Sequence, residues 1–301
     1  MYKLIAIDID GTLLKNNKTI SPENFQAVKK AKEKGVKIVL STGRPIQGLE
    51  KYSQQLGLSE TEDYGIACSG GFIKCLGTNE VIFESTLKLD EFKYLYALSK
   101  KLKITLNALT RDVILTPTLN LTTQIESFLS NLPMKITNFD TIDESTIINR
   151  IVYINETENF ASHLKRVIKR NNINYNPPSR LDGNESLSFD KNNLPNELLE
   201  KFTVLRPSSN TLEILKKGVN KGTSVNLVAE KFGIKPEEII CIGDSDNDLD
   251  MIKYAGLGVA MGNAPDEVKA EANYITYTNE ENGLAHVINK FILEENEEKA
   301  V

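Results

Sequence analysis

Residues 5–14 read IAIDIDGTLL, an apolar run that stops at two carboxylates, Asp8 and Asp10, and is followed at once by Gly11. Such a run predicts a buried strand, and the glycine lets the backbone turn sharply where the strand ends. Two carboxylates at the carboxyl end of a strand suit phosphate chemistry at a magnesium ion, because Asp8 can attack phosphorus as a nucleophile while Asp10 acts as general acid and base. The alternative is an ordinary strand end followed by an Asp-Gly turn.

Composition and charge narrow the class of protein. With 301 residues, 40% of them apolar and 26% charged, the chain can bury the cores of two domains of ordinary size. Its net charge of -5 disfavours nucleic acid as a partner, because nucleic-acid-binding proteins carry a basic stripe. The sequence contains no apolar stretch long enough to span a bilayer, and its N-terminus enters a strand directly. We therefore expect a cytoplasmic protein with no membrane partner.

Cysteines and histidines exclude two further kinds of site. Cys68, Cys75 and Cys241 are odd in number, scattered and without C-x-x-C spacing, so they predict buried thiols instead of disulfides or a zinc site. His163 and His286 are the only histidines, and both lie on predicted helices away from the motifs. Their positions argue against a Ser-His-Asp hydrolase.

Strands and helices alternate in the first and last parts of the chain. In the first part, the sequence predicts strands at residues 3–9, 36–40 and 64–67 and helices at 22–34 and 45–56. In the last part, it predicts strands at 239–242, 257–261 and 274–275 and helices at 223–232, 247–255, after Pro265 and at 284–291. Because the strands are continuously apolar and joined by helices, they predict a parallel sheet covered on both faces.

The middle of the chain does not show the regular alternation of strands and helices. It combines an amphipathic helix with Phe92 and Leu95 on one face, short strands, a second helix around Phe160 to Ile168, and a long Asn-rich loop at 171–193. We interpret residues 84–206 as an inserted α+β domain, so the core, residues 1–83 and 207–301, is discontinuous. Such an insertion would cover the crevice at the carboxyl edge of the sheet, where these folds bind ligands.

Two further stretches offer groups for a phosphate. Residues 41–44 read STGR between a strand and a helix, where a hydroxyl and backbone N–H groups suit an anion. We choose Thr42 for the phosphate contact and Gly43 for its backbone N–H, with a simple N-cap as the alternative. Residues 218–222 read GVNKG, and Lys221 there can offset phosphate charge as a point charge. A solvated surface lysine is the alternative.

Residues 243–248 read GDSDND and follow a predicted strand. Magnesium prefers oxygen ligands, so Asp244 at the strand end can complete a site with Asp8. A calcium-binding EF-hand loop from Asp244 would need glycine and glutamate where Leu249 and Ala255 stand. A dinucleotide-binding fingerprint is also excluded, because the glycines that follow are spaced differently and run through a predicted strand.

These stretches, in this order and spacing, resemble the haloacid dehalogenase superfamily of aspartate-nucleophile phosphatases over essentially the whole chain. The runs VNKG at 219–222, IGDSDND at 242–248 and GVAMGNA at 258–264 are similar to the Cof-type sugar-phosphate phosphatases. The resemblance implies an α/β fold with a Rossmann-like parallel-sheet core and a large inserted α+β cap domain that selects the substrate. One departure is Ser-Gly-Gly at 69–71, where the family usually has Asn-Gly-Ala.

The resemblance also implies a role for each motif residue. The catalytic residues would be Asp8, as nucleophile, and Asp10, as acid and base. The phosphate-binding residues would be Ile9 through its backbone N–H, Thr42, Gly43, Lys221 and Asn247. The magnesium ligands would be Asp8, Asp10 through its backbone carbonyl, Asp244 and Ser245. Asp248 would brace the loop instead of touching the substrate.

The sequence therefore predicts a magnesium-dependent phosphatase that hydrolyses small phosphorylated metabolites, above all sugar phosphates, through an aspartyl-phosphate intermediate. A sugar phosphomutase with the same nucleophile and a non-enzymatic phosphosugar-binding protein are the alternatives. The sequence specifies neither the physiological substrate, nor the cap residues that select it, nor the oligomeric state.

Overall fold

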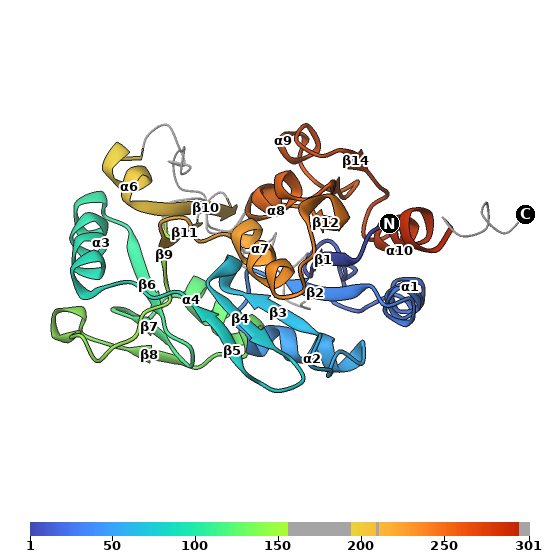
Figure 1. Ribbon diagram of the computed structural model, residues 1–301. Helices are drawn as coiled ribbons and strands as arrows, with labels where there is room; N and C mark the ends of the chain where they lie inside the picture. Colours follow the sequence, from blue (N-terminus) through green and yellow to red (C-terminus); the bar gives the residue numbers. More distant parts are fainter. Residues whose placement is uncertain (156–193, 209–210, 295–301) are drawn as a thin grey trace, which may run out of the picture. The chain divides into compact units, whose positions relative to one another are not determined.

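The apolar run at the start of the chain forms β1 (Leu4–Asp8), which lies inside an eight-stranded sheet of the computed structural model (Figure 1). The other strands of this sheet are β2 (Lys37–Ser41), β3 (Tyr64–Ala67), β4 (Phe72–Cys75), β5 (Val81–Glu84), β12 (Ile239–Gly243), β13 (Leu257–Ala260) and β14 (Tyr274–Ile275). Their order is β14-β13-β12-β1-β2-β3-β4-β5, and all neighbours from β14 to β3 pair in parallel. The predicted α/β class is confirmed.

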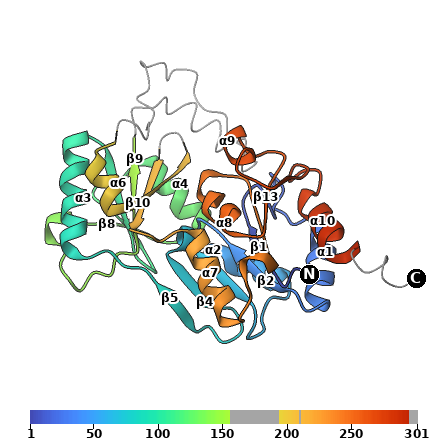
Figure 2. The same cartoon turned by 45° about the horizontal axis from the view of Figure 1, so that its top comes forward.

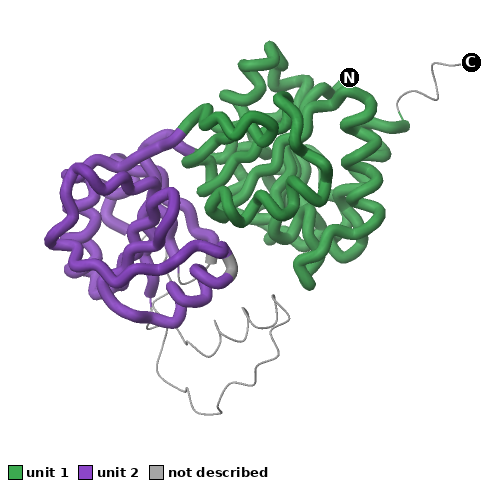
Figure 3. Tube along the Cα trace, turned by 90° about the horizontal axis from the view of Figure 1, so that it is seen from below, with its two compact units in different colours: residues 1–83, 220–301 green, residues 84–219 purple. Residues whose placement is uncertain are grey.

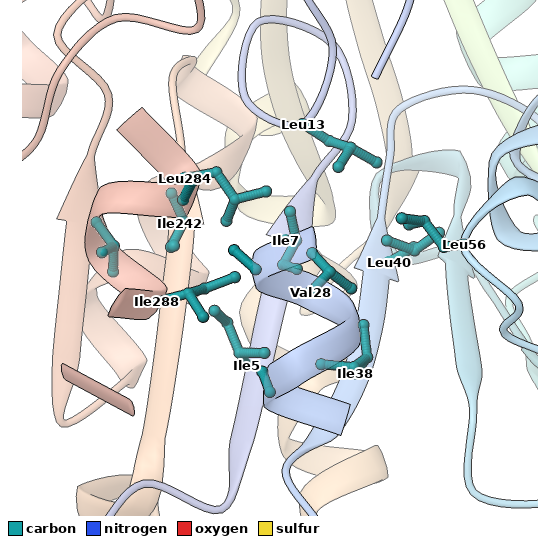
Figure 4. Close-up of a cluster of buried hydrophobic side chains, with 14 of the residues drawn as sticks. Ile5, Ile7, Leu13, Val28, Ile38, Leu40, Leu56, Ile242, Leu284 and Ile288 are labelled. Carbon is teal, nitrogen blue, oxygen red and sulfur yellow. The ribbon is translucent and has the colours of Figure 1, made fainter. Parts of the chain in front are cut away.

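Helices cover both faces of this sheet. They are α1 (Pro22–Glu33), α2 (Gln47–Gln55), α7 (Lys221–Lys231), α8 (Leu249–Tyr254), α9 (Asp266–Lys269) and α10 (Gly283–Ile288). Alternation along β1 sends Ile5 and Ile7 to one face, where they pack with Val28 of α1 and Ile288 of α10 (Figure 4). The other face of the sheet packs against α7 and α8. Both faces are buried, which explains why these strands read as unbroken apolar runs.

The strands β4 and β5 and the start of α7 differ from the sequence expectation. The sequence does not predict β4 and β5, whose four-residue runs are too short to show a clear period, and β4 pairs antiparallel with β3. The helix expected from Thr223 begins at Lys221, because the Asn220 side chain accepts the backbone N–H of Thr223 and caps the helix there. Lys221 therefore lies in the first turn of α7 and not before it.

A second sheet forms in the middle of the chain. Its strands are β6 (Thr105–Leu109), β7 (Ile114–Thr116), β8 (Met134–Ile136), β9 (Arg150–Ile154), β10 (Phe202–Ser208) and β11 (Thr211–Lys216), in the order β10-β11-β9-β6-β7-β8. Its helices are α3 (Leu89–Leu102), α4 (Leu121–Ser130) and α6 (Asn196–Lys201). In Figure 2, α3 and α6 lie on one side of this sheet and α4 on the other. Phe92 and Leu95 of α3 pack against Leu106 and Tyr153 of the sheet.

The structure describes residues 1–155, 194–208 and 211–294. The chain divides into two compact units, residues 1–83 with 220–301 and residues 84–219 (Figure 3). The predicted return to the core at residue 207 is wrong, because β11 pairs with β9 and β10 and so belongs to the second sheet. None of the described helices is long and apolar enough to cross a membrane.

Of the remaining predictions, the one for the cysteines is confirmed, and those for residues 160–168 and 171–193 concern a part of the chain that the structure does not describe. Cys68, Cys75 and Cys241 are free and buried, as predicted. The helix expected around residues 160–168, with His163, and the loop expected at 171–193 lie outside the described residues.

Candidate active site

Two neighbouring strands deliver the first carboxylates of the site. Asp8 is the last residue of β1, and Asp244 directly follows Gly243, the last residue of β12. The two strands pair in parallel with Ile7 opposite Ile242, so their carboxyl ends meet at one edge of the sheet (Figure 1). This is the edge at which open parallel sheets bind ligands.

A third carboxylate and a lysine complete a buried cluster. One carboxylate oxygen from each of Asp8, Asp244 and Asp248 lies within 4.8 Å of the others, and all three side chains are buried. The ammonium group of Lys221, also fully buried, lies 2.7 Å from Asp8 Oδ1 and 2.5 Å from Asp248 Oδ1. Asp8 Oδ2 is buried without a hydrogen-bond partner among the described residues. Three carboxylates beside one lysine leave an excess of negative charge that a bound cation would neutralise.

Burial sets the electrostatics of this cluster. Burial raises the pKa of Asp8 well above its usual range, the charge of Asp248 adds to the rise, and Lys221 offsets it only in part. Burial by itself would lower the pKa of Lys221, but the charges of Asp248 and Asp8 outweigh it and raise that pKa. The lysine therefore stays charged, and ionised Asp8 is costly unless further positive charge lies beside it.

Asp248 holds the loop that carries Asp244. Its Oδ2 accepts the backbone N–H groups of Asp244 and Ser245 at 3.0 and 2.9 Å. Gly243 leaves the space, because a Cβ there would lie 2.4 Å from the Asp248 side chain. The Ser245 hydroxyl lies 2.7 Å from Asn247 Oδ1 and 3.1 Å from Asp248 Oδ2, inside the same loop. The geometry supports the bracing role of Asp248, while the metal contact of Ser245 stays a prediction.

The carboxylate of Asp10 pairs with two basic side chains. Arg44 donates two parallel hydrogen bonds to it, from Nε to Oδ2 and from Nη2 to Oδ1, both 2.6 Å long, and Lys18 Nζ lies 2.6 Å from Oδ1. Burial opposes ionisation of Asp10, but the hydrogen bonds and charge of Arg44, together with Lys18, outweigh burial and hold the pKa of Asp10 far below its usual range. Asp10 is therefore a carboxylate in this structure.

The sequence alone assigns no role to Arg44 or Lys18. Arg44 stands in the STGR stretch after β2, and β2 pairs in parallel with β1, so the loops after the two strands lie at the same sheet edge. That neighbourhood is the signal that could have identified Arg44. Lys18 lies in the loop after β1, and nothing in its sequence context distinguishes it from an ordinary surface lysine among the 36 Lys and Arg residues of the chain.

Hydrogen bonds of Ser69 join the loops that carry three of the predicted phosphate-site residues, which are Thr42, Gly43 and Asn247. The N–H of Ser69 donates to the Thr42 carbonyl at 3.0 Å, and Asn247 Nδ2 donates to Ser69 Oγ at 3.4 Å. The turn at Ser69 persists without the family's asparagine, with Ser69 in the left-handed region at φ 53°. Because α2 begins later than predicted, Thr42 and Gly43 lie in the loop between β2 and α2 and not at a helix N-terminus.

The turn after β1 approaches the second carboxylate closely. Gly11 has φ 87°, and a Cβ on it would lie 2.3 Å from Asp244 Oδ2, so only glycine permits this approach. Ile9 is buried, and its carbonyl accepts the N–H of Leu14 at 3.0 Å. The phosphate contact of the Ile9 N–H stays a prediction.

Comparison with known proteins identifies relatives over nearly the whole chain. The family model of haloacid dehalogenase-like hydrolases matches residues 5–288. The chain is 37% identical over 295 residues to YxeH of Bacillus subtilis (strain 168), covering 97% of this chain and 99% of that protein. It is 31% identical over 301 residues to the 5-amino-6-(5-phospho-D-ribitylamino)uracil phosphatase YcsE of the same organism, covering 97% and 96%.

A solved structure is similar to this protein in both fold and sequence. The crystal structure of a haloacid dehalogenase-like hydrolase from Bacteroides thetaiotaomicron has a TM-score of 0.73 and 30% identity, covering 96% of this chain and 99% of that one. The predicted family, and with it the prediction of a hydrolase enzyme, is confirmed. Matches of this extent show that the chain belongs to the haloacid dehalogenase-like hydrolase family.

Proposed function

We propose that this protein is a magnesium-dependent phosphatase that hydrolyses small phosphorylated metabolites, above all sugar phosphates, through a phosphoryl group carried on Asp8. The observation that carries the proposal is the environment of Asp8. One of its oxygens lies 2.7 Å from Lys221, and the other is buried with no hydrogen-bond partner among the described residues. A buried carboxylate oxygen without a donor is costly, so it indicates an oxygen kept for a metal or for reaction.

The carboxylates of the cluster fit a magnesium ion. Mg²⁺ takes oxygen ligands and is usually bound by one or two carboxylates, with waters and substrate phosphate as the other ligands. Asp8 and Asp244 would hold it, together with the backbone carbonyl of Asp10, and Ser245 would assist. When bound, the ion supplies positive charge that neutralises the phosphoryl group during transfer.

The chain's own residues would carry the two chemical steps. In the first, an Asp8 oxygen attacks phosphorus in line, and the bond from phosphorus to the ester oxygen breaks as protonated Asp10 gives its proton to that oxygen. In the second, water attacks the same phosphorus, its proton passes to Asp10, and the bond to Asp8 breaks. Lys221 stabilises the charge throughout. The phosphoryl oxygens would be held by Lys221 with the Ile9 N–H, Thr42, Gly43 and Asn247.

The pairing of Asp10 with Arg44 bears on its role in these steps. An ionised Asp10 can accept the proton of water directly. To protonate the departing ester oxygen, Asp10 must first take up a proton, and the two bonds from Arg44 oppose that. We therefore infer that Asp10 separates from Arg44 before the first step and that Arg44 returns it to a defined position afterwards.

Replacing Arg44 with alanine is expected to lower kcat for a sugar phosphate by roughly tenfold or more, because acid–base catalysis is worth about 10²–10⁴-fold and depends on placement. Arg44→Lys should recover only part of the loss, since an ammonium cannot donate two parallel bonds. The loss should be smaller with p-nitrophenyl phosphate, whose leaving group departs without a proton. Steady-state kinetics on both substrates measure this, and an equal loss on both would speak against an effect through Asp10.

Removing divalent cations is expected to abolish phosphate release, and added Mg²⁺ should restore it. Because the ion binds the folded cluster, it should also raise the unfolding free energy, by about 2.7 kcal/mol at a concentration 100 times its Kd, and the melting temperature should rise with it. The assay compares phosphate release and thermal unfolding in EDTA and in Mg²⁺. Full activity in EDTA would contradict the metal role.

The substrate class rests on a relative and on the cap. YcsE, at 31% identity, is a phosphatase for a phospho-D-ribitylamino compound, which carries its phosphate on a sugar-derived chain. We assign substrate selection to the second unit, residues 84–219, as the inserted domain. A panel of sugar and polyol phosphates, with phosphate release and isomerised product both measured, tests the class. Conversion of a sugar 1-phosphate to an isomer without phosphate release would indicate a mutase instead.

A further inference from the structure

Asn263 links the second metal-site carboxylate to the turn after β1. It lies in the loop between β13 and α9 and is exposed. Its Nδ2 donates to the Gly11 carbonyl at 2.9 Å and lies 3.3 Å from Asp244 Oδ2. One amide group thus holds two segments that stand far apart in the sequence.

The two acceptors already lie close together. The turn at Gly11 packs directly on Asp244 Oδ2, which is why a Cβ there would collide with it. The other oxygen of the carboxylate, Asp244 Oδ1, lies 3.4 Å from the Thr12 hydroxyl. Each oxygen of Asp244 therefore faces a donor from outside its own loop, so the plane of the carboxylate is held before any cation arrives.

Asn263 is itself held in one orientation. Its Oδ1 accepts the backbone N–H of Asn279 at 2.9 Å, while both groups on its Nδ2 side are oxygen acceptors. Turning the amide over would place oxygen against oxygen, so the assignment is unambiguous. The buried side chain of Asn279 in turn donates to the Leu14 carbonyl at 2.8 Å. Asn263 and Asn279 therefore hold the turn after β1 at two points, the Gly11 and Leu14 carbonyls.

We propose that Asn263 is a positioning residue that sets the affinity of the Asp8–Asp244 site for Mg²⁺ by fixing the Asp244 carboxylate against the Gly11 turn. The inference rests on the proposed magnesium site. Residues that orient a metal ligand commonly contribute 10- to 100-fold to metal affinity, because a ligand that is already in place loses no freedom on binding. Asn263 lies in the GVAMGNA run at 258–264, but the sequence alone gives it no role, because it is remote in sequence from both groups that it holds.

The test is calorimetric titration of the metal-free protein with Mg²⁺, for wild type, Asn263→Ala and Asn263→Leu. The leucine keeps the branched shape of the asparagine side chain while removing its polar atoms. Both variants are expected to raise the Mg²⁺ dissociation constant by about tenfold or more, while the melting temperature of the metal-free protein stays near that of wild type. Asn289→Ala, at an exposed amide after α10, is the matched control and should bind Mg²⁺ as wild type does.

Three results would contradict the proposal, and they can be told apart. Unchanged Mg²⁺ affinity in both variants would overturn the role of Asn263 and leave the magnesium site intact. A lower melting temperature without Mg²⁺, with unchanged affinity of the folded protein, would assign Asn263 to fold stability alone. If the wild type itself takes up no Mg²⁺, the metal site and the role of Asn263 fail together, and that outcome is distinct from the other two.

Discussion

Asp8→Asn is expected to abolish phosphate release from every substrate while the fold is retained. The amide has nearly the shape of the carboxylate, but it cannot form the phosphoryl ester on which both chemical steps depend. Its oxygen can still accept from Lys221, which lies 2.7 Å from Asp8 Oδ1, so the packing of the cluster is preserved. The measurement is phosphate release from p-nitrophenyl phosphate and a sugar-phosphate panel, with Mg²⁺ or EDTA, for wild type and variant together.

The same variant is expected to be more stable than the wild type when no metal is bound. Burial, with Asp248, raises the pKa of Asp8, so the folded state binds a proton there more tightly than the unfolded state. The stability of the wild type therefore falls as the pH rises above the unfolded carboxyl pKa of about 3.9. An amide has no such cost. The gain in melting temperature for Asp8→Asn should be present near neutral pH and shrink as the pH falls toward 4.

Asp63→Asn is the matched control for both effects. Asp63 is a buried carboxylate of the same unit, but it pairs with Lys32 at 2.6 Å and accepts the Glu60 N–H at 2.9 Å. Its replacement should lower stability and leave turnover unchanged. Wild-type turnover in Asp8→Asn would remove the nucleophile from the mechanism, and equal stability losses in the two variants would contradict the account of the Asp8 environment.

The part of the site that lies at strand ends could be predicted from the sequence. β1 and β12 are unbroken apolar runs that stop at carboxylates, and parallel pairing alone brings Asp8 and Asp244 to one edge. Lys221 could be predicted from its glycine-flanked context, although its cap at Asn220 moved the start of the helix. These predictions depend only on backbone direction and on the period of the apolar residues.

The contacts between side chains could not be predicted in the same way. The pairing of Asp10 with Arg44 and the two hydrogen bonds of Asn263 depend on rotamers and on loop paths that no local pattern encodes. The boundary at residue 207 failed for a related reason. Pro207 argues against a strand, yet β10 contains it, because β10 is at the edge of the second sheet where a missing N–H is tolerated.

Lys221→Met is expected to cause the largest loss of stability and a large loss of turnover together. The ammonium lies fully buried between Asp8 and Asp248, so its removal leaves two buried carboxylates without their counter-ion. Breaking a buried ion pair in this way costs about 3–5 kcal/mol of unfolding free energy. Loss of a placed charge at the reacting group should lower kcat by on the order of 10²–10³-fold.

The pH dependence and a control separate this effect from simple loss of packing. Asp248 and Asp8 raise the pKa of Lys221, so its stabilisation is present below the unfolded lysine pKa of about 10.4 and is lost only as the pH rises through the folded value. The difference in unfolding free energy between wild type and Lys221→Met should thus persist across neutral pH and become smaller in strong base. Lys74→Met, which breaks a pair with half-exposed Glu50, should cost about 0–1 kcal/mol and spare turnover.

Added Mg²⁺ distinguishes the loss of positive charge from the loss of packing as the cause of the lower stability of Lys221→Met. If Lys221 acts by neutralising the carboxylates, a cation bound beside them should restore part of the unfolding free energy of Lys221→Met, and restore more of it than Mg²⁺ adds to the wild type. Turnover would stay low, because the ion cannot replace the ammonium 2.7 Å from Asp8 Oδ1. Chemical denaturation with and without Mg²⁺ measures both quantities. No extra gain for the variant would mean that the methionine fails through packing, and the electrostatic account of the cluster would then be wrong.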